Sequence, residues 1–340
     1  MIAEVVIVGG ARTPMAEYVG TPGFGKFKDL SAIQLAVHAS RAALERSRVD
    51  PGSVEHVIMG NALQTSLDAI YGARHVALMA GVPETVPALT VNRLCGSGIQ
   101  SIVNAAQLIR GSEATTVLAG GMENMSQAPY VLYDARQGFR FGKAPEMKDL
   151  LFASLYDPYA DSYMAQTAER IAKRLEITRE QQDEYALRSH RLGAAAVQEG
   201  RFAQEIAPVT VKTRKGETVV ETDDHLRPDT SLEALAGLRA AFGKQGTVTA
   251  GNASGIVDGA AAVVVTSAEH AQQADLDVMA VIRGWSYVGV DPKEMGIGPV
   301  PAIRALLEST GVAQDDIDRF EINEAFSAQY LGCEKELELD

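Results

Sequence analysis

Residues 91–100 read Val91-Asn92-Arg93-Leu94-Cys95-Gly96-Ser97-Gly98-Ile99-Gln100. The run from Val86 to Leu94 is mostly apolar and β-branched, which predicts a buried strand. Beyond Cys95, apolar side chains recur at helical spacing and predict a helix with one buried face. Those side chains are Ile99, Ile102, Val103, Ala106 and Ile109. Cys95 therefore falls where a strand gives way to a helix. Gly96 and Gly98 are expected to allow a tight turn and the close approach of a ligand.

A cysteine at this place suits nucleophilic chemistry. The N-terminus of a helix presents free N–H groups and the positive end of the helix dipole, and both favour the reactive thiolate. A carbonyl attacked by Cys95 would also find backbone donors for its oxyanion. The alternative is a buried structural cysteine that packs as a small hydrophobe. The ten residues alone do not decide between these two interpretations.

The composition narrows the class of protein. The chain has 340 residues, of which 46% are hydrophobic, and this length predicts two or three domains. A net charge of -13 argues against general nucleic-acid binding. Cys95 and Cys333 are the only cysteines, so no disulfide framework is implied. Neither a signal peptide at the N-terminus nor an apolar run of membrane-spanning length is recognised. We therefore expect a cytoplasmic protein that binds neither nucleic acid nor a membrane.

The chain contains an internal repeat. Residues 43–62 and 306–325 align without a gap, and each segment predicts the end of a helix, a turn and a strand. Leu44 matches Leu307 in this alignment, and an amphipathic helix precedes each copy. A repeat separated by most of the chain predicts two similar α/β halves. In register, the second half stops at the equivalent of about Val76, before any counterpart of the Cys95 strand and helix.

A segment of different character lies between the halves. It is richer in charged and aromatic residues, and it predicts helices at Tyr163–Arg174 and at Thr178–Glu199. The second helix starts with a capping-box pattern at Thr178 and Gln181. Long excursions from a compact core are usually functional, so we interpret the segment as an insertion that covers a site. The expected parts are residues 1–122 with the nucleophile, the insertion 123–246, and an incomplete second half, 247–340.

Six motifs, spread from one end of the chain to the other, resemble those of the thiolases. They are Gly9-Gly-Ala-Arg-Thr-Pro14, Val91-Asn-Arg-Leu-Cys-Gly-Ser-Gly98, Gly120-Gly-Met-Glu-Asn-Met-Ser126, Gly246-Thr-Val-Thr-Ala-Gly-Asn-Ala-Ser-Gly255, Met295-Gly-Ile-Gly-Pro-Val-Pro301 and Asn323-Glu-Ala-Phe326. The resemblance is strongest to the group of 3-ketoacyl-CoA thiolases and acetyl-CoA acetyltransferases. It implies the α/β thiolase fold, in which two βαβαβαββ halves form an αβαβα layered core with an inserted loop domain.

The resemblance also implies roles for individual residues. Cys95 matches the nucleophile that becomes acylated, and Asn323 matches the residue that holds an oxyanion-hole water. Contacts to the substrate and coenzyme A are implied at Leu155 and Met164 (acyl group and pantetheine), Phe242 and Ser254 (pantetheine arm) and Arg227 (adenine end). Tyr163 stands where many members of the family have histidine. Coenzyme A is then a substrate, and neither a cofactor nor a metal is expected.

The implied reaction is the reversible cleavage of a 3-ketoacyl-CoA by coenzyme A, or the condensation of two acetyl-CoA, through an acyl-enzyme on Cys95. The family's Gly-His-Pro motif, which supplies a catalytic histidine, and its Cys-x-Gly-x-Gly motif, which supplies a second cysteine, do not occur in the 340 residues. The chain is therefore interpreted either as a thiolase without its final segment, with little or no turnover, or as a non-catalytic thiolase-like protein that binds acyl-CoA or a partner. Thiolases are oligomers, so a homodimer or homotetramer is expected.

Overall fold

The computed structural model describes residues 3–214, 216–243 and 245–339, which divide into two compact units. The first unit comprises the described parts of 1–151, 200–225 and 256–283. The second unit comprises the described parts of 152–199, 226–255 and 284–340. The segment 123–246 contributes to both units. The division into two halves and an insertion stays a prediction.

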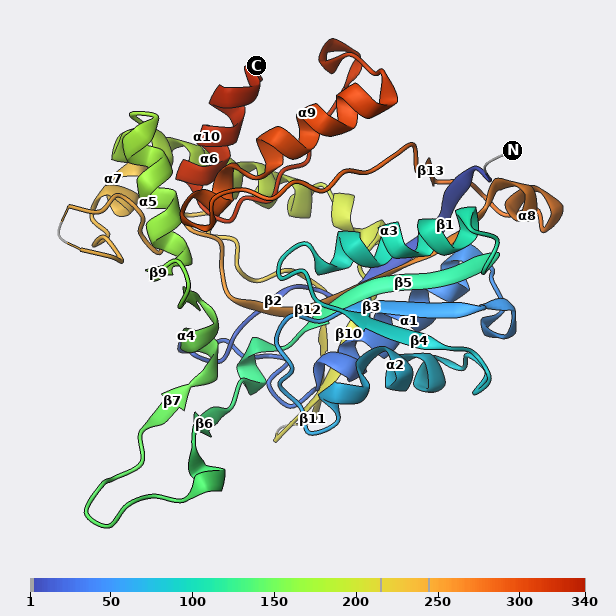
Figure 1. The fold of residues 1–340 in the computed structure, drawn as a ribbon, viewed down its shortest axis with the longest axis horizontal. Helices are drawn as coiled ribbons and strands as arrows, with labels where there is room; N and C mark the ends of the chain where they lie inside the picture. Colours follow the sequence, from blue (N-terminus) through green and yellow to red (C-terminus); the bar gives the residue numbers. More distant parts are fainter. Residues whose placement is uncertain (1–2, 215, 244, 340) are drawn as a thin grey trace. The chain divides into compact units, whose positions relative to one another are not determined.

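A mixed β-sheet is the centre of the first unit, with strand order β13-β1-β12-β5-β3-β4 (Figure 1). Its strands are β1 (Val5–Arg12), β3 (His56–Gly60), β4 (Ala88–Val91), β5 (Thr116–Glu123), β12 (Val257–Ser267) and β13 (Ala280–Val281), with β2 (Ala16–Glu17) beside β12. Strand β3 is parallel to β4 and β5, whereas β12 is antiparallel to β1 and β5. The carboxyl ends of β3, β4 and β5 therefore meet at one edge of the sheet, the usual place for a ligand in an α/β fold.

Helices cover both faces of this sheet: α1 (Ala32–Ser47) and α2 (Gly72–Ala80) lie on one face, and α3 (Ser97–Arg110) lies on the other (Figure 1). Helix α1 starts in a capping box formed by Ser31 and Gln34. The main apolar core joins Leu35 of α1, Leu118 of β5 and Val264 of β12, all of which are fully buried. Each such side chain contributes about 1.5–3 kcal/mol on burial. Shorter elements of this unit are α8 (Ala268–Gln273) and the hairpins β6 (Tyr130–Leu132)–β7 (Met147–Asp149) and β10 (Val209–Thr213)–β11 (Gly216–Val220).

The strand and helix predicted around Cys95 are present as β4 and α3. Strand β4 lies at the end of the sheet order and none of its residues is buried, which corrects the expected buried strand. Val103, Ala106 and Ile109 of α3 are buried as expected, whereas Ile99 is not. Ile99 is 73% exposed, whereas Ser97 and Ser101 are buried. The reason lies in how closely the first turn of α3 approaches the sheet: a Cβ atom added to Gly60 of β3 would lie 2.7 Å from the Cβ atom of Ser97. Small side chains at Ser97 and Ser101 permit this approach, and Ile99 points elsewhere.

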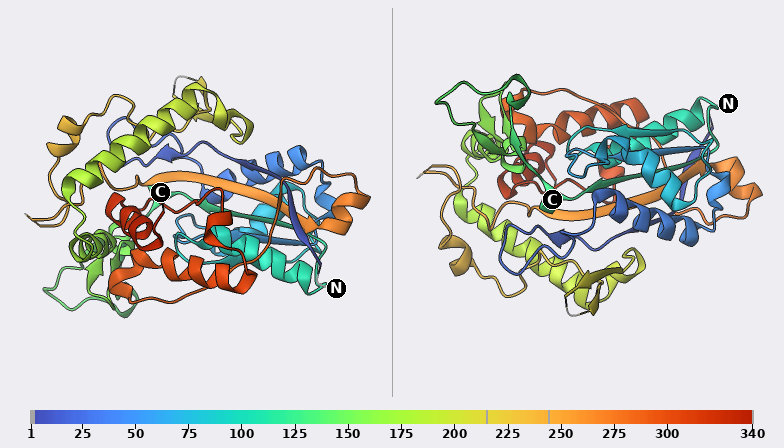
Figure 2. Two further views of the ribbon diagram at one scale, coloured as in Figure 1. Left: turned by 90° about the horizontal axis from the view of Figure 1, so that it is seen from above. Right: turned by 90° about the horizontal axis from the view of Figure 1, so that it is seen from below.

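The second unit is largely helical. Its helices are α5 (Met164–Arg174), α6 (Arg179–Gln198), α7 (Leu232–Ala236), α9 (Pro299–Thr310) and α10 (Ser327–Leu337), and α4 (Leu150–Ser154) spans the boundary between the units. A short hairpin joins β8 (Tyr156–Asp157) to β9 (Ser162–Tyr163). Helix α10 packs against α5, α6 and α9, and Figure 2 shows the long α6 along its length. The two predicted helices are confirmed as α5 and α6, and Thr178 and Gln181 form the expected capping box. Among the described residues, no helix is long and apolar enough to cross a membrane.

The internal repeat is visible in the first part of each copy. Helices α1 and α9 both end in a left-handed residue, Arg48 (φ 59°) and Gly311 (φ 69°), and these two positions match in the alignment. A 3-10 turn follows each in register, at Pro51–Ser53 and Gln314–Asp316. The copies then differ, because 317–325 forms no strand ladder within the described chain. Strand β3 is hydrogen-bonded on both sides, and an extended segment without such neighbours does not become a strand.

Candidate active site

Cys95 lies on an exposed turn between β4 and α3, at the carboxyl edge of the sheet. The N–H of Gly96 donates to the carbonyl of Arg93, and the N–H of Ser97 donates to the carbonyl of Leu94; each hydrogen bond is 3.0 Å long. The left-handed residue of the turn is Leu94 (φ 47°) and not a glycine, which corrects the expected role of Gly96. A leucine rarely takes this conformation, so surrounding contacts must hold it there.

Two polar side chains hold the turn. The Asn92 Oδ1 atom accepts a 2.9 Å hydrogen bond from the N–H of Leu94. The Ser97 hydroxyl accepts from the N–H of Arg93 (2.8 Å) and donates to the carbonyl of Leu94 (2.6 Å). The Asn92 side chain also donates to the carbonyl of Ala62, just beyond β3 (3.1 Å). The turn is thus bonded both to itself and to the neighbouring strand end.

The ends of β3 and β5 are joined at the same edge. The Glu123 carboxylate, at the end of β5, accepts from the N–H groups of Ala62 and Leu63, the latter over 3.2 Å. Asn61 donates to the carbonyl of Met122 over 3.0 Å. Burial raises the pKa of Glu123, and these donors oppose the rise. The ends of β3, β4 and β5 therefore form one connected polar edge, and the Cys95 turn is part of it.

Cys333 has a different environment. It is fully buried on α10 and packs with Val300 and Leu337. Its thiol donates to the carbonyl of Gly296 over 3.3 Å. Burial raises the pKa of the Cys333 thiol to about 11. A neutral, buried thiol is neither accessible nor reactive, so Cys95 is the cysteine suited to nucleophilic chemistry.

Asn323 and Ser254 lie on two neighbouring segments of the second unit. The N–H of Ser254 donates to the carbonyl of Ala325 (3.0 Å), and the N–H of Ser327 donates to that of Asn252 (2.9 Å). Both Asn323 and Ser254 are exposed. Two residues predicted to contact the same substrate are thus carried by directly bonded stretches of backbone.

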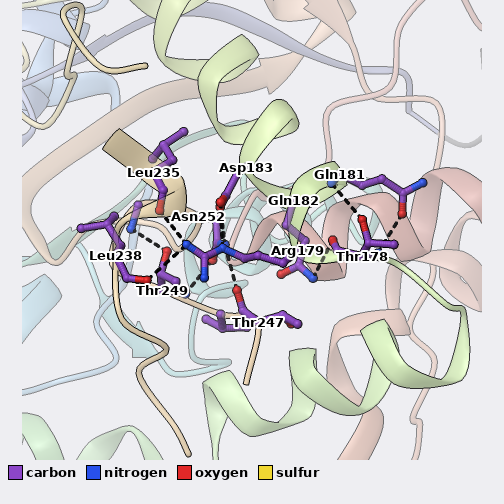
Figure 3. Close-up of polar contacts among 12 residues, drawn as sticks. Thr178, Arg179, Gln181, Gln182, Asp183, Leu235, Leu238, Thr247, Thr249 and Asn252 are labelled. Carbon is purple, nitrogen blue, oxygen red and sulfur yellow. Dashed lines mark hydrogen bonds and ion pairs between the residues drawn. The ribbon is translucent and has the colours of Figure 1, made fainter. Parts of the chain in front are cut away.

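Helix α6 holds the segment that carries Ser254 (Figure 3). The buried Asp183 carboxylate accepts from the Asn252 amide (2.9 Å) and from the Arg179 guanidinium (2.7 Å). Arg179 also donates to the carbonyl of Leu235 over 2.6 Å. The Asn252 Oδ1 atom accepts from the N–H of Thr249 over 2.8 Å. This network fixes the loop that leads to Ser254.

The same helix holds the segment that carries Asn323, through contacts to Glu324. Tyr185 and Ser189 donate hydroxyl hydrogen bonds of 2.6 and 2.7 Å to the two oxygens of the Glu324 carboxylate. The Tyr185 ring stacks on Tyr330 of α10, with ring centroids 4.5 Å apart. Burial and the nearby Glu324 carboxylate raise the pKa of Tyr185, which keeps its hydroxyl a donor. Asn323 is therefore flanked by a residue that α6 holds in place.

The remaining predicted contacts also lie in the second unit. The N–H of Met164 donates to the carbonyl of Leu155 over 3.0 Å. Phe242 packs on Tyr163, with ring centroids 5.1 Å apart. The N–H of Arg227 donates to His190 of α6 over 3.3 Å. The structure thus groups Leu155 with Met164, and Ser254 with the Asn323 segment, whereas Cys95 belongs to the first unit.

Sequence reasoning missed the supporting residues. Asp183, Tyr185 and Ser189 were not singled out, although the spacing of Arg179 and Asp183 is that of a helical ion pair. Glu324 lies within the motif Asn323-Glu-Ala-Phe326, and no sequence pattern indicates its supporting role. Within the described residues, no group of three or more His, Cys, Asp or Glu side chains could hold a metal ion.

A sheet with helices on both faces and an exposed cysteine at the turn into a helix is an arrangement that suits nucleophilic chemistry. The sequence matches the family models "Thiolase, N-terminal domain" over residues 5–269 and "Thiolase, C-terminal domain" over residues 276–340. The chain belongs to the thiolase family and is an acyltransferase. Coenzyme A is a substrate of this family and not a bound cofactor. The second half is thus recognisable as a domain, and its incompleteness stays a prediction.

Named relatives agree with this assignment. A mitochondrial 3-ketoacyl-CoA thiolase of Homo sapiens is 47% identical over 340 residues, which are 100% of this chain and 84% of that protein. An acetyl-CoA acetyltransferase of Cupriavidus necator is 44% identical over 100% of this chain and 85% of its own length. The crystal structure of the human mitochondrial 3-ketoacyl-CoA thiolase in complex with CoA has a TM-score of 0.95, with 47% identity over 100% of this chain and 84% of that one.

These relatives contradict the expected cytoplasmic location. Those from Homo sapiens, Pongo abelii and Bos taurus, 46–47% identical over the whole chain, are mitochondrial, which points to mitochondria rather than the cytoplasm. The expectation was wrong because a low cysteine count indicates only a compartment without disulfide formation. It does not distinguish one reducing compartment from another.

Proposed function

We propose that the protein catalyses the reversible cleavage of a 3-ketoacyl-CoA by coenzyme A, with Cys95 as the nucleophile. One observation carries the proposal: the Cys95 thiol is exposed on a turn that leads into α3, at the edge where β3, β4 and β5 end. A nucleophilic thiol needs access and a polar surrounding that favours the thiolate. The buried Cys333 has no such access.

The reaction proceeds in two half-reactions. The Cys95 thiolate attacks the 3-keto carbonyl, and the bond between the α and β carbons breaks. The acyl group stays on the sulfur as a thioester, and the acetyl-CoA carbanion takes up a proton. The thiolate of a second coenzyme A then attacks the thioester, which releases acyl-CoA and restores the Cys95 thiolate. In the opposite direction, the same steps condense two acetyl-CoA. Such a reaction serves the β-oxidation of fatty acids.

The second unit supplies the proposed contacts to coenzyme A. Ser254 and Phe242 contact the pantetheine arm, Leu155 and Met164 contact the acyl group and pantetheine, and Arg227 contacts the adenine end. Asn323 holds the water of an oxyanion hole. The backbone bond between the Ser254 and Ala325 positions supports a shared role, because it keeps the pantetheine and oxyanion contacts in register.

Both half-reactions depend on proton transfer, which acid–base groups of the protein assist. The Gly-His-Pro and Cys-x-Gly-x-Gly motifs of the family do not occur in them. Losing a general acid–base group typically costs about 10²–10⁴-fold in rate. We therefore propose that these 340 residues, tested by themselves, form the Cys95 acyl-enzyme slowly and turn over slowly.

We also propose that the chain forms a homodimer or homotetramer. Strand β4 is the last strand in the sheet order of the described residues, and its Leu89 is half-exposed. Leu67, Ile70 and Tyr71 precede α2 and are also exposed. An apolar surface beside a sheet edge favours association, because it removes apolar area and backbone groups from water together.

The test follows the acyl group. The protein is incubated with acetoacetyl-CoA or a longer 3-ketoacyl-CoA, and the acylated peptide is identified by mass mapping. We expect an acyl group on Cys95 in the wild type and in Cys333→Ser, and none on this peptide in Cys95→Ser. Acylation at Cys333 would overturn the proposal. Binding of acyl-CoA without acylation, measured by calorimetry, would instead favour a non-catalytic acyl-CoA-binding protein.

A further inference from the structure

We propose that Ser97 and Asn92 are positioning residues, which hold the Cys95 turn in the geometry required for acyl transfer. The inference rests on the proposed function of Cys95. Neither side chain is assigned a role in the reaction itself. They act on the backbone that carries the cysteine.

The turn needs such support because its conformation is intrinsically unfavourable. Leu94, directly before the nucleophile, has a φ of 47°. In this region the Cβ atom of an L-residue crowds the following carbonyl oxygen. Leu94 is also 67% exposed, so packing of its side chain does not compensate. Without other contacts, the residue would return to an extended or right-handed conformation.

Hydrogen bonds to the N–H and to the carbonyl of Leu94 supply this support. Asn92 accepts from the Leu94 N–H, and Ser97 donates to the Leu94 carbonyl. Ser97 also accepts from the N–H of Arg93. Ser97 itself cannot shift toward the sheet, because it is 5% exposed and packs against Gly60 at a distance that leaves no room for a Cβ atom there.

This arrangement sets the direction of the donors around the thiol. The N–H groups of Gly96 and Ser97 are used inside the turn, whereas those of Gly98 and Ile99 lie in the first turn of α3, where helical N–H groups have no intrahelical partner. If Leu94 relaxes, the thiol moves relative to these N–H groups. Acyl transfer depends strongly on such placement, and a displacement of about 1 Å can cost about 10²-fold in rate. Alkylation by a small free reagent forms no oxyanion for these donors to bind, so they affect it only through the fraction of thiolate.

The experiment compares two reactions of the same thiol in the 340-residue protein. The rate of Cys95 acylation by acetoacetyl-CoA and the rate of its alkylation by iodoacetamide are measured for Ser97→Ala and Asn92→Ala. We expect acylation to slow by about 10–100-fold in Ser97→Ala, while the alkylation rate per thiolate, taken from the pH dependence of alkylation, stays close to wild type. Ser101→Ala is the matched control, because Ser101 is a buried serine of the same helix whose hydroxyl donates to the carbonyl of Gly98 (2.7 Å).

A second-site change separates positioning from general damage to the fold. Glycine adopts positive φ without strain, so Leu94→Gly combined with Ser97→Ala should recover part of the lost acylation rate. A cavity or a loosened helix would not be repaired by this change. If Ser97→Ala does not fold, Asn92→Ala alone and with Leu94→Gly provides the same comparison on the exposed side of the turn.

The outcomes are distinct. If the wild type is not acylated, the proposed function fails and this inference fails with it. If the wild type is acylated, and Ser97→Ala and Asn92→Ala react like Ser101→Ala, only the positioning role is overturned. Equal losses of acylation and alkylation, without recovery by Leu94→Gly, would also overturn it, because they indicate structural damage alone.

Discussion

The hydroxyl of Tyr185 on α6 lies 2.6 Å from a carboxylate oxygen of Glu324, the residue next to Asn323. Ser189 binds the other oxygen of this carboxylate. Helix α6, which the sequence predicts within an insertion, is thus hydrogen-bonded to the Asn323–Phe326 motif near the other end of the chain. The proposed oxyanion residue is therefore coupled to α6 through its neighbour.

Tyr185→Phe tests this coupling. The change removes one hydrogen bond to a charged group but keeps the ring that stacks on Tyr330, so we expect a loss of about 1–2 kcal/mol in the free energy of unfolding. Ser189→Ala should cost less, because its bond is more exposed. Denaturant melts of both variants and of the double variant measure the effects. If Tyr185→Phe leaves the melt unchanged, Glu324 is not held as the structure indicates.

The Asp183 network predicts a larger effect. Asp183→Asn removes the charge that pairs with Arg179 and weakens the bond to Asn252, and breaking a buried pair typically costs about 3–5 kcal/mol. Arg179 is partly exposed, so we expect about 2–3 kcal/mol by denaturant unfolding. Glu184→Gln is the control on the same helix, because Glu184 is exposed. That variant should stay within about 0.5 kcal/mol of wild type. Equal effects of the two changes would refute the network's importance.

Cys333 predicts a dependence of stability on pH. Its thiol has a pKa of about 11 in the folded chain, against an ordinary value of 9.0. The unfolded chain therefore loses this proton first as the pH rises, and the folded state is destabilised between about pH 9 and pH 11. The loss from this group is at most about 3 kcal/mol. Melts of wild type and Cys333→Ala over this range measure it. The stability curve of Cys333→Ala should be flatter than that of wild type.

Leu89 tests the proposed association. Leu89→Lys places a charge on the edge strand β4, where it opposes pairing with another strand. We expect the oligomer to dissociate at lower protein concentration, as measured by sedimentation or light scattering. Val219→Lys is the control, since Val219 is similarly exposed but lies on the β10–β11 hairpin. An oligomer equally stable in both variants would place the interface elsewhere.

Sequence patterns predicted helices and strands well where contacts between residues close in sequence determine them. The capping box at Thr178 and Gln181 marked the start of α6, because it satisfies N–H groups within four residues. The strand, cysteine and helix around Cys95 followed in the same way from apolar spacing. The missing strand at 317–325 shows the limit, since a strand depends on neighbours that its own sequence does not specify.

The sequence motifs propose members of the candidate site but do not report the residues that support them. The motifs named Cys95, Asn323 and Ser254, and their roles stay predictions. The left-handed Leu94 could not be foreseen, because two glycines nearby were the more probable turn residues on conformational grounds. The link from Asp183 to Asn252 joins residues 69 positions apart, and no local periodicity reports such a contact.

The attachment of both site segments to α6 has a consequence for motion. The N–H groups of Ser254 and Ser327 are bonded within the pair of segments that this helix holds, so neither can open alone while α6 stays folded. Hydrogen exchange at these two amides should then report one cooperative opening, with a common free energy and a common response to denaturant. Thermal fluctuations would displace Ser254 and Asn323 together and leave the spacing between them nearly constant.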